Sequence, residues 1–528
     1  MNILQNRQTI VLTSFLIILI VCLIPLFQLA LSFDFSVINN VNTVNLSTLF
    51  FDSILIVGAA SLIAMFIGGV LAYYLATVHI RFSIVLILLL LTNFFIPSYI
   101  HALSWSRLFM DESILNTIAI YTGMDIKGST VIDGWFGTVW VLALSYFPII
   151  FVAVYLSCLR WGQSMQNAAL MFGSPSRARI IRLTFLRVPL LVSTLLVFLL
   201  IFSDFGVPDL FQIPMYSTEI FIQLSSYYNN SNALFISLPY IITSCIILWW
   251  IISLTKKISL SLSTADSNPS KVRVSGPVSF LVHTLLYGCI FIVIVLPLLN
   301  LIYLTQDFEM FFRAFELVKT DLLNSTLFAG FVSIVIVLFA LYASYGYVRL
   351  KSHYKEGLRI IIFLMLVLPA SLLALSLISF WNQEGMMGWF YQSEGIVVLG
   401  VSIRWLPIAF EILLIGWLFV NEKQENAALV FGVGWWSVVK NIHFPQMKPF
   451  ILSVFILCFV LAFNELTMMV LLSPPGLSLL PGRIFSVIHY GPENLLAAIC
   501  LIQVITILVI VSSIAWYNRH LIISTQRA

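Results

Sequence analysis

Residues 323–348 read LNSTLFAGFVSIVIVLFALYASYGYV, a stretch that contains no Asp, Glu, Lys or Arg. A run of about 20 apolar residues is long enough to cross the ~30 Å hydrocarbon core of a bilayer as a helix. Backbone amides and carbonyls find no water in that core, so a helix that pairs them internally is the favoured structure. The stretch therefore predicts a transmembrane helix.

The rest of the 528-residue chain has the same character. It is 61% hydrophobic and only 9% charged, whereas soluble domains carry about 25% charged residues. Apolar stretches of similar length predict twelve spans, at 9–31, 50–77, 83–108, 137–159, 189–211, 233–255, 279–304, 323–348, 358–381, 396–420, 450–473 and 494–517. The sequence predicts an all-α polytopic membrane protein, and its small net charge of +4, without a long basic tract, indicates no nucleic-acid partner.

The two halves of the chain repeat each other. Matching residues lie 272 positions apart in the second and third spans of each half: Ser53, Gly58, Ser61, Tyr73, Pro97 and Ser104 with Ser325, Gly330, Ser333, Tyr345, Pro369 and Ser376. From Pro148 and Pro407 onward the offset is 259. Six spans per half give two parallel repeats about an axis along the membrane normal. The predicted boundaries are 1–258 for the first repeat, 259–277 for a cytoplasmic linker and 278–528 for the second repeat.

The positions of Lys and Arg predict the orientation. If the N-terminus is cytoplasmic, the inner segments hold 20 of the 26 basic residues and only 4 of the 22 acidic ones. The opposite orientation would place nearly all of this positive charge outside. We therefore expect a multi-pass membrane protein with both termini in the cytoplasm.

Two cytoplasmic loops occupy the same place in the two halves, after the fourth span of each. One reads QNAALMFG over 166–173 and the other ENAALVFG over 425–432. Ala and Leu favour a compact helix, and the Gly permits a sharp turn after it. A single such helix could rest on anionic lipid, but its duplication at one topological position favours a docking element.

These loops resemble the EAA motif of type I ABC importer permeases, which reads Glu-Ala-Ala, three residues, Gly, nine residues, Ile, one residue, Leu-Pro. The matching residues are Ala168, Ala169 and Gly173 in the first loop and Ala427, Ala428, Gly432 and Pro445 in the second. Asn167 and Asn426 stand where the motif has Glu, which puts the ion pair of that Glu in question.

The resemblance implies a fused permease subunit of a binding-protein-dependent ABC importer, located in the bacterial inner membrane. Each loop would dock as a coupling helix on one of two cytoplasmic ABC ATPase subunits, and a periplasmic binding protein would deliver the substrate. The chain has no G-x-x-x-x-G-K-[ST] loop, so we expect a non-catalytic subunit without a cofactor, with ATP bound by its partners.

Fused permeases of this kind are similar to the ferric-iron importer permeases, with thiamine and phosphonate permeases as relatives. The stretches SDFGVPD at 203–209 and NELT at 464–467 resemble segments of the iron permeases. Ferric iron is the implied substrate, and thiamine, phosphonate or another small solute is the alternative. An ion-coupled secondary transporter could also have twelve spans in parallel halves, but neither it nor a channel or scaffold explains two EAA-like loops.

Polar residues inside the predicted spans are candidates for the translocation pathway, because a charge in the hydrocarbon costs ~2.5–3.5 kcal/mol on insertion scales. They are Asp204, Glu465, Asn464, Arg404 and Glu411. Asp204 and Glu465 lie at near-equivalent depths in the two halves, where facing carboxylates would form an electronegative entrance for a cation. Arg404 and Glu411 lie seven residues apart on one helix face and could pair with each other, so structural pairing and transport are both open for them. No metal-binding cluster is predicted.

Overall fold

The computed structural model describes residues 13, 20, 23–31, 46–108, 133–171, 173–227, 229–256, 277–349 and 352–527. This part of the chain is built from helices and contains no β-strand. Within it, nine helices are long and apolar enough to cross a membrane, or eleven if each of two bent helix pairs is one span. The predicted all-α membrane fold is confirmed, whereas the number of twelve spans stays a prediction. Most of the predicted span 9–31 and the predicted linker 259–277 lie outside the described residues.

The helices of the first half are α2 (Ile24–Leu31), α4 (Leu46–Thr77), α5 (Ser83–Thr92), η2 (Asn93–Phe95), α6 (Ser98–Arg107), α8 (Gly134–Leu159), α9 (Gln163–Met171), α10 (Pro175–Phe202), α11 (Gly206–Leu210), α12 (Tyr216–Ser225) and α13 (Asn230–Lys256). Those of the second half are α14 (Pro277–Ile290), η3 (Phe291–Val295), α15 (Leu296–Leu304), α16 (Phe308–Arg349), α17 (Ser352–Val367), α18 (Ala370–Trp381), α19 (Met386–Tyr391), α20 (Gly395–Phe419), α21 (Glu422–Val430), α22 (Trp435–Val438), η4 (Val439–His443), α23 (Phe444–Phe463), α24 (Thr467–Leu472), α25 (Leu480–Tyr490) and α26 (Glu493–Arg527).

The third predicted span of each half is bent rather than straight. The helices α5 and α6 meet at 96°, and α17 and α18 meet at 104°. Pro97 and Pro369, which are equivalent in the repeat, stand at the N-cap positions of α6 and α18. Proline cannot donate a backbone hydrogen bond and disfavours a helical conformation in the residue before it, so each span breaks at this point.

The fifth and eleventh predicted spans also end earlier than expected. The helices α10 and α23 end at Phe202 and Phe463, and the short helices α11 and α24 follow after a break. The predictions 189–211 and 450–473 are therefore wrong at their outer ends. This difference matters because the breaks contain Asp204 and Glu465.

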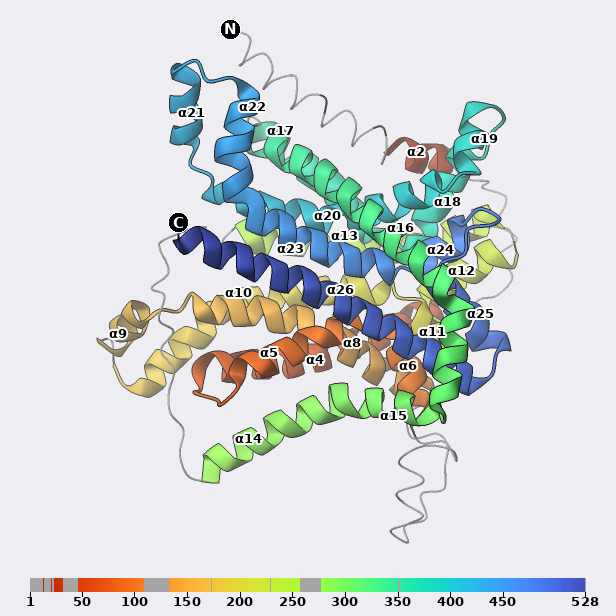
Figure 1. The fold of residues 1–528 in the computed structure, drawn as a ribbon, viewed down its shortest axis with the longest axis horizontal. Coiled ribbons are helices and arrows are strands. Elements are labelled where there is room, and N and C mark those ends of the chain that lie inside the picture. Colours follow the sequence, from red (N-terminus) through yellow and green to blue (C-terminus); the bar gives the residue numbers. More distant parts are fainter. Residues whose placement is uncertain are drawn as a thin grey trace.

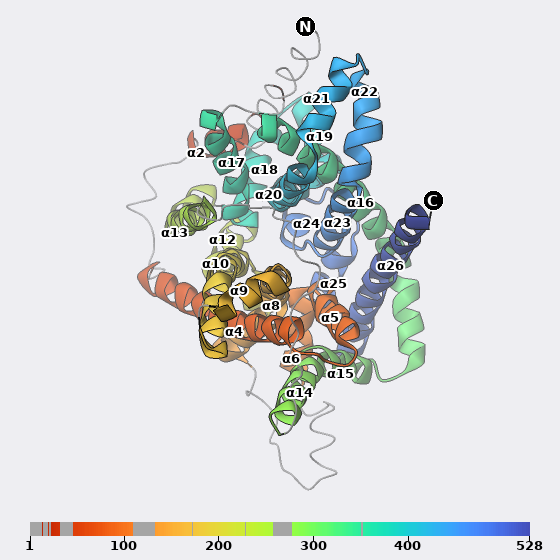
Figure 2. The ribbon, with the colours of Figure 1, turned by 90° about the vertical axis from the view of Figure 1, so that its left-hand side faces the viewer.

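Each half contacts the end of the first predicted span of the other half. The helix α2 packs against α18, and α15 packs against α6, as Figure 2 shows at opposite ends of the molecule. Gln28 donates its amide N–H to the Ser379 carbonyl at 3.3 Å, and Asn300 donates to the Ser104 carbonyl at 2.9 Å. Gln28 and Asn300 are 272 positions apart. The repeat therefore extends into the tertiary contacts between the halves.

The long helices run roughly side by side, and the two short helices of the EAA-like loops project from one end of the molecule. Figure 1 places α9 and α21 at this end, with the C-terminal end of α26. Viewed from that end, α21 belongs to the upper part and α9 to the lower part of the molecule (Figure 2). The breaks that hold Asp204 and Glu465 lie toward the opposite end.

Candidate functional site

Asp204 occupies the break between α10 and α11, and its carboxylate has three hydrogen-bond donors. Oδ2 accepts from the Ser98 hydroxyl at 2.6 Å and from the Tyr146 hydroxyl at 2.8 Å, and Oδ1 accepts from the Val207 amide at 3.2 Å. The residue is only 8% exposed. Buried carboxylates require such donors, because leaving them without partners costs several kcal/mol.

Glu465 occupies the corresponding break between α23 and α24. Oε1 pairs with Arg404 Nη1 at 2.8 Å and accepts from the Met468 amide at 3.3 Å, while Oε2 accepts from the Trp405 indole N–H at 3.1 Å. The Glu465 side chain is 4% exposed and that of Arg404 is 13% exposed. The second half therefore contains a largely buried ion pair at this level.

The two carboxylate sites are repeats of one another with one difference in charge. Tyr146 and Trp405 lie 259 positions apart, and each donates to the carboxylate of its own half. The counterpart of Arg404 is Ser145, whose hydroxyl instead donates to a carbonyl of its own helix at 2.9 Å. Asp204 has no ion pair among the described residues, so the first-half carboxylate keeps its charge uncompensated.

Polar contacts at this level join the two halves directly. Arg404 Nη2 reaches the Ser203 hydroxyl at 3.4 Å, and the Asn464 amide donates to the Phe95 carbonyl at 3.2 Å. Gln503 from α26 donates to Asn464 Oδ1 at 3.0 Å. The cluster therefore lies across the interface between the repeats, where a pathway between two such halves would pass.

Two of the predicted charge arrangements are wrong. Arg404 does not pair with Glu411: seven residues along one helix separate them by about 10 Å, and Arg404 turns to Glu465 instead. Glu411 pairs with Arg359 of α17 through contacts of 2.8 and 3.2 Å. Nor do Asp204 and Glu465 form an uncompensated acidic pair, because Arg404 neutralises Glu465.

The first predicted coupling element forms the helix α9. Asn167 and Ala168 are exposed, whereas Ala169 is buried against Trp161 and Ala178. The small side chain of Ala169 allows α9 to approach the start of α10 closely.

The second predicted coupling element forms the helix α21, in which Asn426 and Ala427 are exposed and Ala428 is half-buried. Large apolar side chains are exposed at the tips of both elements: Met171 at 88%, Val430 at 84%, Phe431 at 86% and Trp436 at 81%. Exposed apolar surface of this kind marks interaction sites.

Both motif glycines adopt backbone conformations that other residues disfavour. Gly432 has φ +73° and Gly173 has φ +152°. The Val433 amide donates to the Ala428 carbonyl at 3.0 Å, the bond that typically closes a helix ending in a left-handed glycine. The predicted turn after each short helix is confirmed.

Glu425 is a residue whose importance the sequence analysis missed. It precedes Asn426, is fully buried, and forms an ion pair with Arg349 at the end of α16. The Tyr345 hydroxyl lies 3.3 Å from Oε1, and His443 Nε2 lies 3.5 Å from Oε2. The second loop therefore does contain an acid in an ion pair, but this acid is Glu425, one position before Asn426, which aligns with the Glu of the motif. The sequence feature that could have identified this residue is an acid directly before the Asn-Ala-Ala segment.

The first half lacks this anchor. Gln166, the counterpart of Glu425, accepts a hydrogen bond from the Trp161 indole at 2.8 Å, and Thr77 stands in the place of Arg349. Arg182 is buried and lies over the Tyr73 ring at 5.6 Å. The two halves thus differ in these contacts: a buried ion pair lies under α21, whereas the first half has a neutral hydrogen bond and a cation–π contact.

Pro445 marks a further difference between the halves. It is exposed at the start of α23, directly after the π-helical turn η4. Its counterpart Leu186 is buried inside the continuous helix α10. A proline removes one backbone hydrogen bond of the helix, which accounts for the widened turn in the second half.

Residues 336–522 match the family model described as "Binding-protein-dependent transport system inner membrane component". The matched region contains α21, Arg404 and Glu465. The second half of the chain therefore carries a binding-protein-dependent transport permease domain.

The permease also resembles two curated proteins. It is 24% identical over 358 residues to the Fe(3+)-transport system permease protein FbpB 2 of Haemophilus influenzae, an alignment that covers 65% of this chain and 68% of the relative. It is 23% identical over 197 residues to the ferric transport system permease protein FbpB of Actinobacillus pleuropneumoniae, covering 37% of this chain and 28% of that protein.

Proposed function

We propose that this permease imports ferric iron, driven by two cytoplasmic ABC ATPase subunits and supplied by a periplasmic binding protein. The observation that carries the mechanism is the pair of helices α9 and α21, which repeat one sequence, project from one end and expose apolar side chains. The substrate is inferred from the names of the two relatives, both ferric-iron permeases.

In this proposal, α9 and α21 each insert into a cleft of one ATPase subunit. The apolar side chains at their tips would be buried there, at about 25 cal/mol per Å² of apolar surface. The buried Glu425–Arg349 pair would connect α21 rigidly to α16, and α16 continues along the second half past α20 and α23. Movement of the ATPase subunits would reach the polar cluster by this route.

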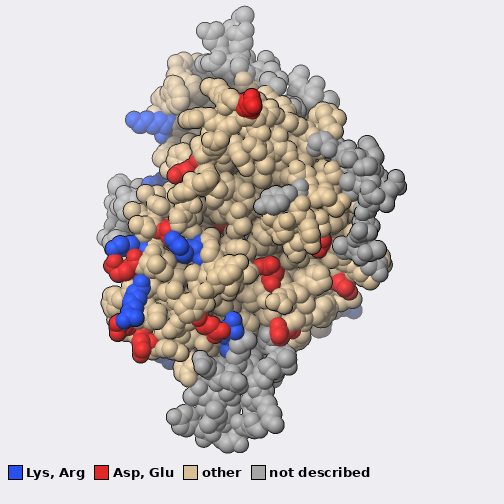
Figure 3. Space-filling model, turned by 90° about the vertical axis from the view of Figure 1, so that its right-hand side faces the viewer, with Lys and Arg blue, Asp and Glu red and all other residues tan. Residues whose placement is uncertain are grey.

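The polar cluster, which consists of Asp204, Arg404, Asn464 and Glu465 with their partners, would close the pathway. The pathway would open when the contacts between the two halves separate. Outside the inner segments the sequence holds 18 acidic and 6 basic residues, the remainder of the 22 and 26 in the chain. Figure 3 shows acidic side chains scattered over the face opposite α9 and α21. A negative field at the entrance would raise the local concentration of a cation.

The proposed orientation predicts which positions a membrane-impermeant thiol reagent can reach. In a variant without native cysteines, Ser176→Cys and Ser437→Cys should resist labelling in intact cells and react after the membrane is opened. Glu384→Cys, between α18 and α19 at the opposite end, should react in intact cells. If the reagent labels the first two positions in intact cells, the orientation is the opposite of the one proposed, and α9 and α21 cannot contact the ATPase.

Gly432→Val should lower substrate-stimulated ATP hydrolysis of the reconstituted complex several-fold while the protein still inserts. A left-handed backbone conformation costs a residue with a Cβ roughly 1–2 kcal/mol, and a β-branched side chain tolerates it least, so α21 would be displaced. Gly434→Val is the matched control, because Gly434 has an ordinary φ of −63° and no atom within 4 Å of an added Cβ. Equal hydrolysis by both variants would argue against α21 as the docking element.

Asp204→Asn should reduce uptake of labelled ferric iron in cells by about tenfold, because it removes the uncompensated charge of the cluster and weakens the bonds from Ser98 and Tyr146. Folding should survive, since a neutral side chain lowers the cost of burial. Uptake is corrected for the amount of permease in the membrane, and the exposed Asp307→Asn serves as the control. If Asp204→Asn takes up iron at the wild-type level, this carboxylate is not part of the pathway. If the unmodified permease takes up thiamine or a phosphonate but not iron, the proposed substrate is wrong.

A further inference from the structure

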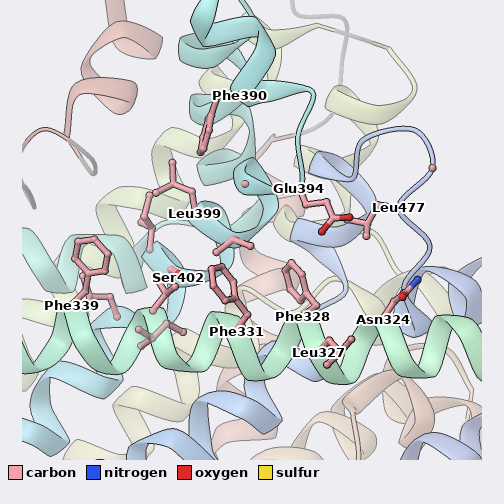
Figure 4. Close-up of a pocket in the computed structure, with 17 residues that line it drawn as sticks. Asn324, Leu327, Phe328, Phe331, Phe339, Phe390, Glu394, Leu399, Ser402 and Leu477 are labelled. Carbon is pink, nitrogen blue, oxygen red and sulfur yellow. The ribbon is translucent and has the colours of Figure 1, made fainter.

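A cavity of about 630 Å³ lies between α16 and α20, away from the polar cluster. Phe328, Phe331, Phe339, Leu327 and Leu399 form much of its wall, as Figure 4 shows. Its volume falls within the ~300–1,000 Å³ that is typical of small-molecule sites. Leu327 and Phe331 of α16 are 64% and 58% exposed, so the cavity opens on the lipid-facing side of the helix.

Polar atoms are confined to two levels of this apolar cavity. Glu394 and Asn324 stand at the end opposite α9 and α21, and Figure 4 shows both beside Leu477. Glu394 is exposed and has no ion pair among the described residues. The Asn324 amide N–H reaches the Ser478 carbonyl at 3.4 Å, which leaves the side-chain oxygen of Asn324 able to accept.

Ser402 provides the second polar level. It is 8% exposed, it lines the cavity, and its hydroxyl has no hydrogen-bond partner in the described part of the chain. Eight residues of helix separate it from Glu394, which corresponds to about 12 Å. A buried hydroxyl without a partner costs roughly what a lost hydrogen bond costs, so an acceptor from a ligand would stabilise it.

The corresponding place in the first half carries different side chains. Trp135, Phe136 and Trp140 occupy the positions of Glu394, Gly395 and Leu399, and the rings of Phe136 and Trp140 stack with centroids 6.4 Å apart. Ala143 occupies the position of Ser402. The first half thus lacks the carboxylate and the hydroxyl and places aromatic side chains in their region.

The helices of the first half also approach more closely. The α4 positions equivalent to Phe331 and Phe339 are Ala59 and Ile67. At the neighbouring Gly68, an added Cβ would lie 2.7 Å from the Phe147 carbonyl of α8. Small residues allow helices in membranes to pack at short distance, whereas the larger phenylalanines keep α16 and α20 apart. The side chains that shape this cavity therefore differ between the two halves.

We propose that this cavity binds one phosphatidylethanolamine molecule from the outer leaflet. Its ammonium group would lie against Glu394 and Asn324, the Ser402 hydroxyl would donate to an ester carbonyl, and an acyl chain would follow the phenylalanines toward Phe339. From Asn324 to Phe339 the wall extends about 22 Å along α16, enough for a headgroup and the ~15 Å half-thickness of the core. The exposed carboxylate selects an ammonium lipid, because an anionic headgroup would be repelled.

The test is lipid retention by the full-length permease, measured by native mass spectrometry after extraction from nanodiscs of equal parts phosphatidylethanolamine and phosphatidylglycerol. The wild type should retain one phosphatidylethanolamine in preference to phosphatidylglycerol. Glu394→Gln should lower that preference about fivefold, as expected for the loss of one charge-assisted contact. Glu384→Gln, an exposed acid outside the cavity lining, should leave the preference unchanged.

A second variant tests the cavity itself. Leu399→Trp places the first-half side chain in the cavity and should abolish retention of the lipid, whereas the volume-conserving Leu399→Met should preserve it. The proposal is wrong if the wild type retains both lipids equally, or if Leu399→Trp retains as much phosphatidylethanolamine as the wild type. Either result would leave only non-specific lipid contact. If Leu399→Trp fails to fold, the headgroup preference of Glu394→Gln decides the matter. None of these measurements depends on the transported substrate.

Discussion

Replacement of Glu465 by glutamine should destabilise the permease by about 3–5 kcal/mol, because Arg404 would keep its charge in a largely buried site without a counter-ion. The remaining described partner of Arg404 is the Ser203 hydroxyl at 3.4 Å. The change is nearly isosteric, so lost packing contributes little. Thermal unfolding of the purified permease should therefore shift to a clearly lower temperature, and iron uptake should fall with it.

The double variant Glu465→Gln/Arg404→Met separates the ion pair from other effects. Removing both charges leaves no uncompensated group, so most of the lost stability should return. Glu411→Gln is the matched control, since its pair with Arg359 is more exposed, at 25% and 22%, and should cost less. If Glu465→Gln unfolds at the wild-type temperature, the ion pair with Arg404 does not stabilise the second half.

The second large effect is expected at the base of α21. Glu425→Gln should reduce coupled ATP hydrolysis by more than about tenfold, because Arg349 loses its counter-ion and α21 loses its charged link to α16. Glu425 is fully buried, so water cannot replace the lost contact. The readout is the ratio of substrate-stimulated to basal ATP hydrolysis in the reconstituted complex, which distinguishes coupling from simple loss of protein.

The first half supplies the control for this prediction. Gln166→Ala removes the counterpart of Glu425 from α9 but breaks only a neutral hydrogen bond from Trp161, worth about 0.5–1.5 kcal/mol. It should lower coupling much less than Glu425→Gln. Equal losses in both variants would show that the two short helices are anchored with equal strength, contrary to the asymmetry described above.

Local sequence was sufficient to predict several features of this permease. Apolar stretches such as 323–348 require a helix wherever lipid is the solvent, so the fold class followed from composition. Pro97 and Pro369 revealed the repeat, and the Gly432 turn followed from a residue that tolerates positive φ. The exposed short helices after the fourth span of each half could be predicted for the same reason, because their pattern is local.

Which charges pair was decided only by the tertiary structure. Arg404 and Glu411 share one helix face, but α17 brings Arg359 to Glu411 and the end of α23 brings Glu465 to Arg404. Ion pairing depends on distances between segments that lie far apart in the sequence, and helical spacing alone carries no information about them. The buried position of Glu425 is of the same kind, because Arg349 precedes it by 76 residues.

An all-helical membrane protein with two similar short helices could be predicted from the sequence, because helix formation in lipid and glycine turns depend on neighbouring residues. The places where the helices break, the charges that neutralise one another and the cavity between α16 and α20 followed from the tertiary structure alone. Those features depend on how closely two helices approach, and that distance is set by side chains on both of them at once.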